Sequence, residues 1–138
     1  MLTEKDYCDY ETSVALKELG YVGICDAYYE LTGSEDYNRD SFELLYTRDF
    51  IHPDDIDRVA APLLYQAQKW LREEKGIFVY IDVPWKTDDG LGWSYFCCNK
   101  PMTEEDKEVC FASGGFYDSY EEALAEGIKE AVKILKGK

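Results

Sequence analysis

Two spacings of apolar residues meet at one glycine near the middle of the chain. Before Gly76, apolar residues recur every three or four positions, which is typical of one face of a helix. Pro62 suits the first turn of such a helix, and glycine often ends one. From Ile77 the apolar residues alternate, as in a strand with one buried face. The pattern predicts a helix from Pro62 and then a strand up to residue 83, with Trp70 buried between helix and sheet.

Capping signals predict a helix near each end of the chain. Near the N-terminus the pattern predicts a helix over about residues 4–19, or one that begins at Thr12 or Ser13 with the first turns separate. Near the C-terminus, Ser119 and Glu122 form a capping box ahead of a long amphipathic segment. The last helix is therefore expected to begin directly after Ser119.

The segment between the first two helices has a weaker pattern. Residues 24–31 are apolar and aromatic, which predicts a strand and leaves a short helix as the alternative. Residues 35–57 carry many charges and no regular period, so a long loop with one or two short turns is expected there.

The second half of the chain has the pattern of a meander. The Asp-Gly pair at 89–90 is a hairpin signal, and alternating residues over 93–98 predict a returning strand. A third strand is expected near residues 108–113, ended by the glycine pair at 114–115. The simplest fold is α+β, in the order α-β-α-β-β-β-α. It has an antiparallel meander of three to four strands with helices packed on one face. With 138 residues, a single domain over 1–138 is expected.

Charge narrows the classes of partner. The chain has 29 acidic and 15 basic residues, a formal net charge of −14. Direct binding to nucleic acid is not expected, because it needs a basic surface. The N-terminus lacks the pattern of a signal peptide, and the apolar runs are too short to span a bilayer. We therefore expect a cytoplasmic protein that does not enter membranes. Its acidic surface either only aids solubility or docks on a basic partner.

Catalytic and metal-binding residues are not predicted. His52 is the only histidine, and Asp54 and Asp55 follow it, but no nucleophile accompanies them in the sequence. The acidic segment 36–47 begins like a calcium loop and lacks the required glycine and glutamate. The 5 cysteines include no C-x-x-C pair and are expected to be reduced packing residues. No cofactor and no metal are expected, and the chain is not expected to be an enzyme.

Aromatic residues suggest a binding surface. The chain has 12 Tyr, 6 Phe and 3 Trp, more than a core of this size is expected to bury completely. Tyrosine and tryptophan are enriched in interfaces, so contact with an unidentified protein partner is expected, and the oligomeric state is left open. The candidate interaction residues are Tyr37, Tyr46, His52, Trp85, Phe116 and Tyr117.

Several short motifs stand in the order and spacing of a known group of proteins. They are Leu16-Lys17-Glu18-Leu19-Gly20-Tyr21, Ala61-Pro62 followed by Lys69-Trp70-Leu71-Arg72-Glu73, Lys100-Pro101-Met102-Thr103 and Tyr120-Glu121-Glu122-Ala123-Leu124. On these motifs, nearly the whole chain resembles a family of small uncharacterised proteins from phages and mobile elements of gut bacteria. The resemblance carries no activity, cofactor or catalytic residue.

A second, weaker resemblance is to the PAS sensor domain. Leu31-Thr32-Gly33, Ile51-His52-Pro53-Asp54-Asp55 and Asp89-Gly90 ahead of Trp93 are similar to its landmarks. A PAS domain would imply a ligand pocket and signalling. The central helix is long for that fold, however, and no strand pair precedes the Thr-Gly.

The leading functional hypothesis is a non-enzymatic accessory protein of a mobile element that acts through protein–protein contacts. The alternatives are a PAS-like small-molecule sensor and an acidic inhibitor that imitates DNA. An enzyme built around His52 is a further class, which would need its acidic neighbours to converge in a cleft.

Overall fold

The computed structural model describes residues 2–23, 25–30, 44–47, 58–82, 84–88, 90–99 and 110–137. The chain forms two compact units, Met1–Gln66 and Ala67–Lys138. We describe each unit separately, and call them the N-terminal and the C-terminal unit. No described helix is both long and apolar enough to cross a membrane.

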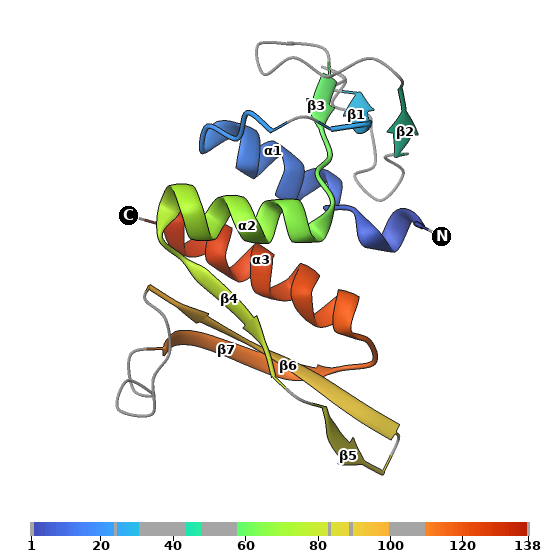
Figure 1. The fold of residues 1–138 in the computed structure, drawn as a ribbon, viewed down its shortest axis with the longest axis vertical. Helices are drawn as coiled ribbons and strands as arrows, with labels where there is room; N and C mark the ends of the chain where they lie inside the picture. The colour runs from blue at the N-terminus through green and yellow to red at the C-terminus, as the bar shows by residue number, and fades with distance from the viewer. Residues whose placement is uncertain are drawn as a thin grey trace. The chain divides into compact units, whose positions relative to one another are not determined.

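The N-terminal unit combines short helices with a small antiparallel sheet. The sheet order is β2-β1-β3, with both outer strands antiparallel to β1. Figure 1 labels all of these elements except the short η1 turn. They are the 3-10 turn η1 (Glu4–Asp6), α1 (Tyr10–Glu18), β1 (Ala27–Glu30), β2 (Leu45–Tyr46) and β3 (Arg58–Ala60).

Two caps divide the first helical segment. The Asp6 carboxylate accepts a hydrogen bond from the Thr3 backbone N–H at 2.7 Å, which stabilises η1. Asp9 then accepts from the Thr12 N–H at 2.8 Å and begins α1. One helix over residues 4–19 is therefore wrong. The first turns are separate, as in the alternative, but α1 begins at Tyr10, earlier than that alternative placed it.

The small sheet was only partly predicted. The strand expected over residues 24–31 is confirmed over Ala27–Glu30 as β1, and residues 24 and 31 lie outside the described residues. Residues 45–46, expected to be in a loop, form β2, and Arg58–Ala60 forms β3 on the other side of β1. These strands have 2 and 3 residues, too few to show an alternating pattern, and pairing with β1 defines them.

Tyrosines contribute much of the core of the N-terminal unit. The hydroxyl of buried Tyr29 donates to the Cys8 carbonyl at 3.0 Å, so its polar end is paired inside the core. Tyr10 packs edge-on against Tyr29, with ring centroids 5.8 Å apart. The main buried cluster consists of Tyr7, Ala27, Tyr29, Leu44, Val59 and Ala61.

The C-terminal unit is a meander covered by a long helix. Along one edge of β6, residues 90–92 pair with β5 and residues 95–98 pair with β4, and the other edge pairs with β7 (Figure 1). This confirms the predicted antiparallel meander. The elements are β4 (Phe78–Ile81), β5 (Trp85–Thr87), β6 (Gly90–Cys98), β7 (Cys110–Tyr117) and α3 (Tyr120–Lys136), preceded by α2 (Leu64–Lys75), which begins in the N-terminal unit.

The strand that follows α2 is divided in two. Gly76 has φ +68°, which confirms it as the left-handed end of α2. Ile81 pairs with Tyr95 and Trp85 pairs with Gly92, so the register shifts by one residue between β4 and β5. Pro84 lies at this shift, where a missing backbone donor is tolerated.

The third strand extends further than predicted. Gly114 and Gly115 were expected to end it, but both lie within β7, paired with Tyr95 and Ser94. A Cβ on Gly115 would lie 2.6 Å from the Ser94 Cβ. The glycine therefore permits a close approach between strands and does not mark a turn.

The last helix packs closely on the sheet at a glycine. Ser119 caps α3 and accepts from the Glu122 N–H at 3.1 Å, as predicted. A Cβ on Gly127 would lie 2.7 Å from Val79 Cγ1, so only glycine permits this helix-to-sheet distance. Cys97 Sγ lies 3.3 Å from the Gly127 carbonyl oxygen, to which it donates a weak hydrogen bond.

Trp70 is not the fully buried anchor that the pattern predicted. Its side chain is half-buried, and Lys75 Nζ lies 5.5 Å from its ring centroid. Leu71, one position further, is fully buried instead. The buried face of α2 consists of Leu64, Ala67 and Leu71. It is rotated by about one position from the face that the pattern predicted.

Candidate functional site

The structure describes four of the six candidate interaction residues. Tyr37 and His52 lie outside the described residues. Trp85 belongs to β5, where its Cα pairs in register with Gly92. The hypotheses that depend on Tyr37 or His52, including an enzyme built around His52, therefore stay predictions.

The other three candidates fall into two separate groups. Tyr46 lies in β2 of the N-terminal unit, and its side chain is 59% exposed. Phe116 and Tyr117 lie in β7 of the C-terminal unit. Phe116 is 65% exposed, whereas Tyr117 is half-buried and stacks on Tyr95 with ring centroids 6.2 Å apart.

Tyr46 belongs to a group of aromatic and acidic side chains that we call the Tyr46 cluster: Asp6, Tyr7, Asp26 and Tyr46. The Tyr46 ring packs edge-on against Tyr7, with centroids 5.8 Å apart and an interplanar angle of 73°. The Tyr7 hydroxyl donates to Asp26 Oδ1 at 3.3 Å. Tyr7 is buried, but Asp26 and Tyr46 are exposed. The cluster therefore presents an aromatic ring and a carboxylate to solvent above a buried tyrosine.

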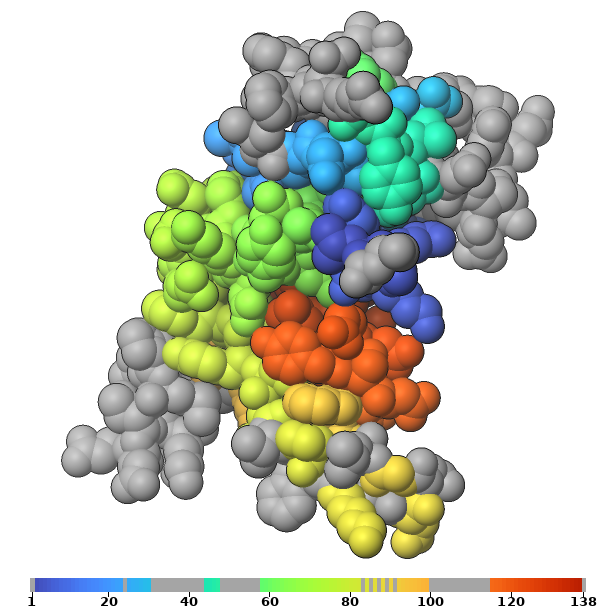
Figure 2. All heavy atoms as spheres, turned by 45° about the vertical axis from the view of Figure 1, so that its right-hand side comes forward, coloured from blue at the N-terminus to red at the C-terminus, as the bar shows by residue number. Residues whose placement is uncertain are grey.

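The backbone of the small sheet holds these side chains together. Ala27 pairs with Tyr46 between β1 and β2, and the Thr47 N–H donates to the Asp26 carbonyl at 2.9 Å. These bonds place Asp26 beside the end of β2. Figure 2 shows β2, in turquoise, on the surface of the molecule. Sequence reasoning found Tyr46 from its residue type, but not Asp26, because their proximity depends on the pairing of a two-residue strand.

The electrostatics of the cluster keep Tyr7 protonated. Burial, together with the smaller effect of the negative charges of Asp26 and Asp6, raises the pKa of Tyr7 to about 12. The phenol is therefore a hydrogen-bond donor at neutral pH. It supports one oxygen of Asp26 and leaves the other acceptor sites of that carboxylate open to solvent.

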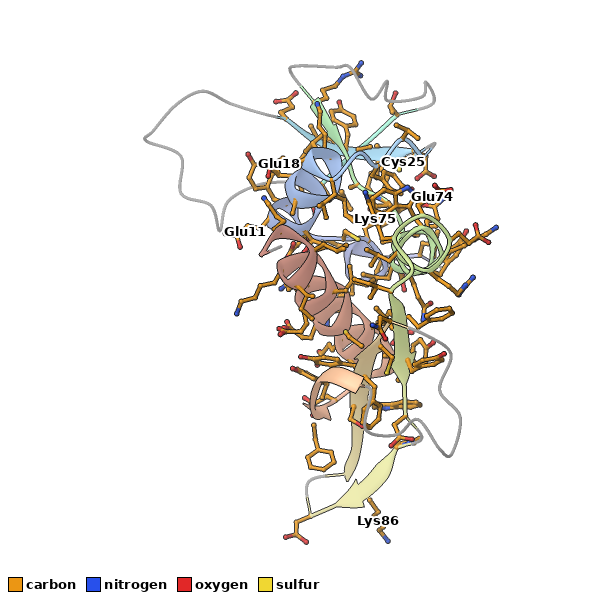
Figure 3. All side chains as sticks on the ribbon, turned by 90° about the vertical axis from the view of Figure 1, so that its left-hand side faces the viewer. Glu11, Glu18, Cys25, Glu74, Lys75 and Lys86 are labelled. Carbon is orange, nitrogen blue, oxygen red and sulfur yellow. The ribbon has the colours of Figure 1, made fainter. Side chains whose placement is uncertain are left out.

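The surrounding unit is strongly acidic. Met1–Gln66 contains 15 acidic and 5 basic residues, whereas Ala67–Lys138 contains 14 and 10. Most of the net charge therefore belongs to the unit that carries the Tyr46 cluster. Glu11 and Glu18, for example, are both exposed on α1 (Figure 3).

The C-terminal unit has a second aromatic surface, on the face of its sheet opposite α3. Tyr95 and Cys97 face α3, so alternation places Phe96 on the other side. Tyr80 is directly across from Phe96 and shares its side, and Phe78 stacks on Tyr80 with centroids 6.0 Å apart. The rings of Phe78, Tyr80 and Phe96 are half-buried.

Phe116 extends this second surface. A Cβ on Gly92 would lie 2.6 Å from Phe116 Cδ1, so the phenyl ring covers the glycine. Phe116 and Tyr117 are consecutive in β7 and lie on different faces: Phe116 covers Gly92, and Tyr117 stacks on Tyr95. The four aromatic side chains of this surface, Phe78, Tyr80, Phe96 and Phe116, are uncharged, in contrast to the carboxylates of the Tyr46 cluster.

The Cys25 thiol is not an activated nucleophile. Burial raises the pKa of the Cys25 thiol to about 11, so it is protonated at neutral pH. The Cys25 side chain, labelled in Figure 3, is buried in the N-terminal unit. Its Sγ lies 3.8 Å from the Tyr21 hydroxyl oxygen. Among the described residues, no group of three His, Cys, Asp or Glu side chains is arranged to hold a metal ion.

Comparison with known proteins assigns no relative. No family model, no curated protein and no solved structure matches the chain. We therefore infer the function from the chemistry of the described surfaces.

Proposed function

We propose that the protein is a non-enzymatic, cytoplasmic accessory protein of a mobile element, and that it binds a basic surface of another protein through the Tyr46 cluster. One observation carries the binding proposal. A 59% exposed tyrosine lies in the same cluster as an exposed carboxylate, in the unit with 15 acidic and 5 basic residues.

The physical properties of the cluster suit protein binding. Tyrosine supplies a large, rigid contact area with little loss of conformational entropy, and is enriched among the residues that dominate interfaces. A surplus of negative charge attracts a basic partner over a distance of about 10 Å at moderate ionic strength. Because Tyr7 is buried beneath Tyr46, the exposed ring is held in place before binding.

Affinity capture tests this function. The tagged protein and its Tyr46→Ala variant are used as baits in a lysate of gut bacteria, at low and high salt. Tyr65→Ala is the matched control, because Tyr65 is also in the N-terminal unit and is 61% exposed. We expect wild type and Tyr65→Ala to retain the same proteins at low salt, and Tyr46→Ala to lose them. Equal capture by all three baits, or no capture, contradicts the proposal.

The imitation of DNA has less support in the described residues. Such a mimic needs an unbroken row of carboxylates. On α3, Glu126 pairs with Lys129 at 3.4 Å, and the exposed residues Lys133 and Lys136 follow. Basic residues thus interrupt the acidic positions of this helix, and we do not propose this function.

A further inference from the structure

We infer that the Tyr46 cluster recognises an arginine side chain of its partner, in preference to lysine. The inference rests on the proposed function and specifies its chemistry. The occupant is an arginine that lies on the Tyr46 ring and donates to the Asp26 carboxylate.

The same sheet already contains an arginine that lies over a tyrosine ring. Arg58 of β3 lies over the Tyr28 ring of β1, with its guanidinium carbon 5.4 Å from the ring centroid. Glu30 is the register partner of Arg58 on β1. A tyrosine and an acidic residue of β1 therefore flank an arginine of the neighbouring strand.

The other side of β1 presents the same types of residue to solvent. Tyr46 of β2 supplies the ring, and Asp26, directly before β1, supplies the carboxylate. In the described part of the chain, the two cations found over aromatic rings are Arg58 on Tyr28 and Lys75 on Trp70, and neither covers Tyr46. The Tyr46 cluster thus has the same residue types, a tyrosine and an acidic residue, as the neighbours of Arg58 on β1.

The geometry of the two carboxylate oxygens favours a guanidinium. Tyr7 donates to Asp26 Oδ1, which holds the carboxylate in place and leaves Oδ2 to accept further bonds. Guanidinium is planar, so it can stack on a ring while its edge donates to a carboxylate. An ammonium group is a compact and strongly hydrated charge, which gains less from the ring. The negative charge of the unit attracts both, so the ring and the carboxylate must supply the preference.

Titration with short capped peptides tests the inference. Oligo-arginine, oligo-lysine and oligo-citrulline of equal length are titrated into the full chain by calorimetry. Citrulline keeps the planar shape and removes the charge. We expect oligo-arginine to bind about fivefold more tightly than oligo-lysine, and oligo-citrulline to bind weakest, given the usual strength of a cation–ring contact.

Variants locate the binding site. Tyr46→Leu keeps an apolar side chain and removes the ring, and Asp26→Asn keeps the acceptor for Tyr7 and removes the charge. Each is expected to weaken oligo-arginine binding about fivefold and to reduce the preference over lysine. Tyr65→Leu should leave both unchanged. Thermal melting of each variant checks that the fold is retained.

Three results overturn the inference: equal affinity for arginine and lysine peptides, an equal loss in Tyr65→Leu, or no loss in Tyr46→Leu. Its failure is distinguishable from that of the proposed function. If lysate capture depends on Tyr46 but the peptides show no arginine preference, the inference falls and the function stands. If the peptides behave as expected and lysate capture ignores Tyr46, the function falls and the inference about arginine stands.

Discussion

The two units of the chain have cores of different composition. The N-terminal unit buries whole tyrosines and gives their hydroxyls partners, such as the Cys8 carbonyl for Tyr29 and Asp26 for Tyr7. The C-terminal unit packs the aliphatic face of α3 on its sheet, at a distance set by Gly127. The tyrosine core of the N-terminal unit needs hydrogen-bond partners for its hydroxyl groups. The aliphatic core of the C-terminal unit needs side chains whose shapes fit closely.

The unit that carries the candidate binding cluster is not the unit that we expect to be more stable. The N-terminal unit has short strands, most of the net charge, and an exposed ring and carboxylate. The C-terminal unit has strands of 9 and 8 residues and a helix of 17 residues. We expect the C-terminal unit to be the more stable of the two. All 3 tryptophans, at positions 70, 85 and 93, belong to it, so tryptophan emission is the signal assigned to that unit.

Alkaline pH should produce the largest difference between the units. In the N-terminal unit, burial raises the pKa of Cys25 from 9.0 to about 11 and that of Tyr7 from 10.0 to about 12. Burial also raises the pKa values of Tyr21 and Tyr29. A raised pKa favours the protonated group in the folded state. Its contribution to stability is complete below the unfolded pKa and is lost as pH rises toward the folded pKa.

We therefore expect stability to fall from about pH 9 to pH 12 by more than any single substitution below causes. In the C-terminal unit, burial likewise raises the pKa of Tyr95 to about 12. More groups have a raised pKa in the N-terminal unit, so we expect this unit to unfold first as pH rises. Circular dichroism should then show a first transition before tryptophan emission changes. A simultaneous change in both signals would contradict the separation of the units.

Truncation of the α3 core should have the largest effect among single substitutions. Ile128 is 0% exposed, so Ile128→Ala is expected to lower the free energy of unfolding by about 2–5 kcal/mol through lost burial and a residual cavity. Ile134, which is half-buried on the same helix, supplies the control Ile134→Ala with a smaller loss. Urea unfolding followed by tryptophan emission measures both. An equal effect of the two substitutions would show that Ile128 is not at the centre of this core.

The sequence predicted the elements whose signals are local. Ser119 caps α3 through a bond to a residue three positions on, and Gly76 ends α2 by its own backbone conformation. The antiparallel meander follows from alternation over several residues. In these places, local preference and the final fold agree, so the pattern is sufficient.

Features that depend on distant pairing could not be predicted. Strands β2 and β3 are defined by β1, from which they are separated in sequence, and they are too short to show a period. The glycine pair in β7 looks like a turn signal but serves the close approach of Ser94. For the candidate site, Tyr46 was found by residue type, whereas its neighbour Asp26 required the sheet register.

A methyl group added at Gly127 should have the next largest effect. The new Cβ of Gly127→Ala would lie 2.7 Å from Val79 Cγ1 and 3.2 Å from Tyr95 Cβ, so helix and sheet must separate. The expected loss of unfolding free energy is about 1–3 kcal/mol. Gly137→Ala is the matched control, because its nearest neighbour would be at 3.4 Å. If Gly127→Ala is as stable as Gly137→Ala, the close packing of α3 on the sheet is wrong.

Loss of one tyrosine hydroxyl tests the polar core of the N-terminal unit. Tyr29→Phe removes the donor to the Cys8 carbonyl and leaves the ring in place. We expect a loss of about 1 kcal/mol, since this is the usual net value of a buried hydrogen bond. Tyr65→Phe, at an exposed position, should be neutral. Chemical denaturation followed by circular dichroism compares the two, and equal stability would show that the hydroxyl of Tyr29 has no structural role.

The smallest effect on stability is expected at the residue with the largest expected effect on binding. Tyr46→Leu removes an edge-on contact with Tyr7, and the side chain is already 59% exposed. The loss of unfolding free energy should therefore be below about 1 kcal/mol. A melting temperature close to that of wild type, together with weakened capture of partners, would show that this ring serves recognition and not folding. A loss as large as that of Ile128→Ala would instead make Tyr46 a structural residue. The contrast between a binding unit and a stable unit would then not hold.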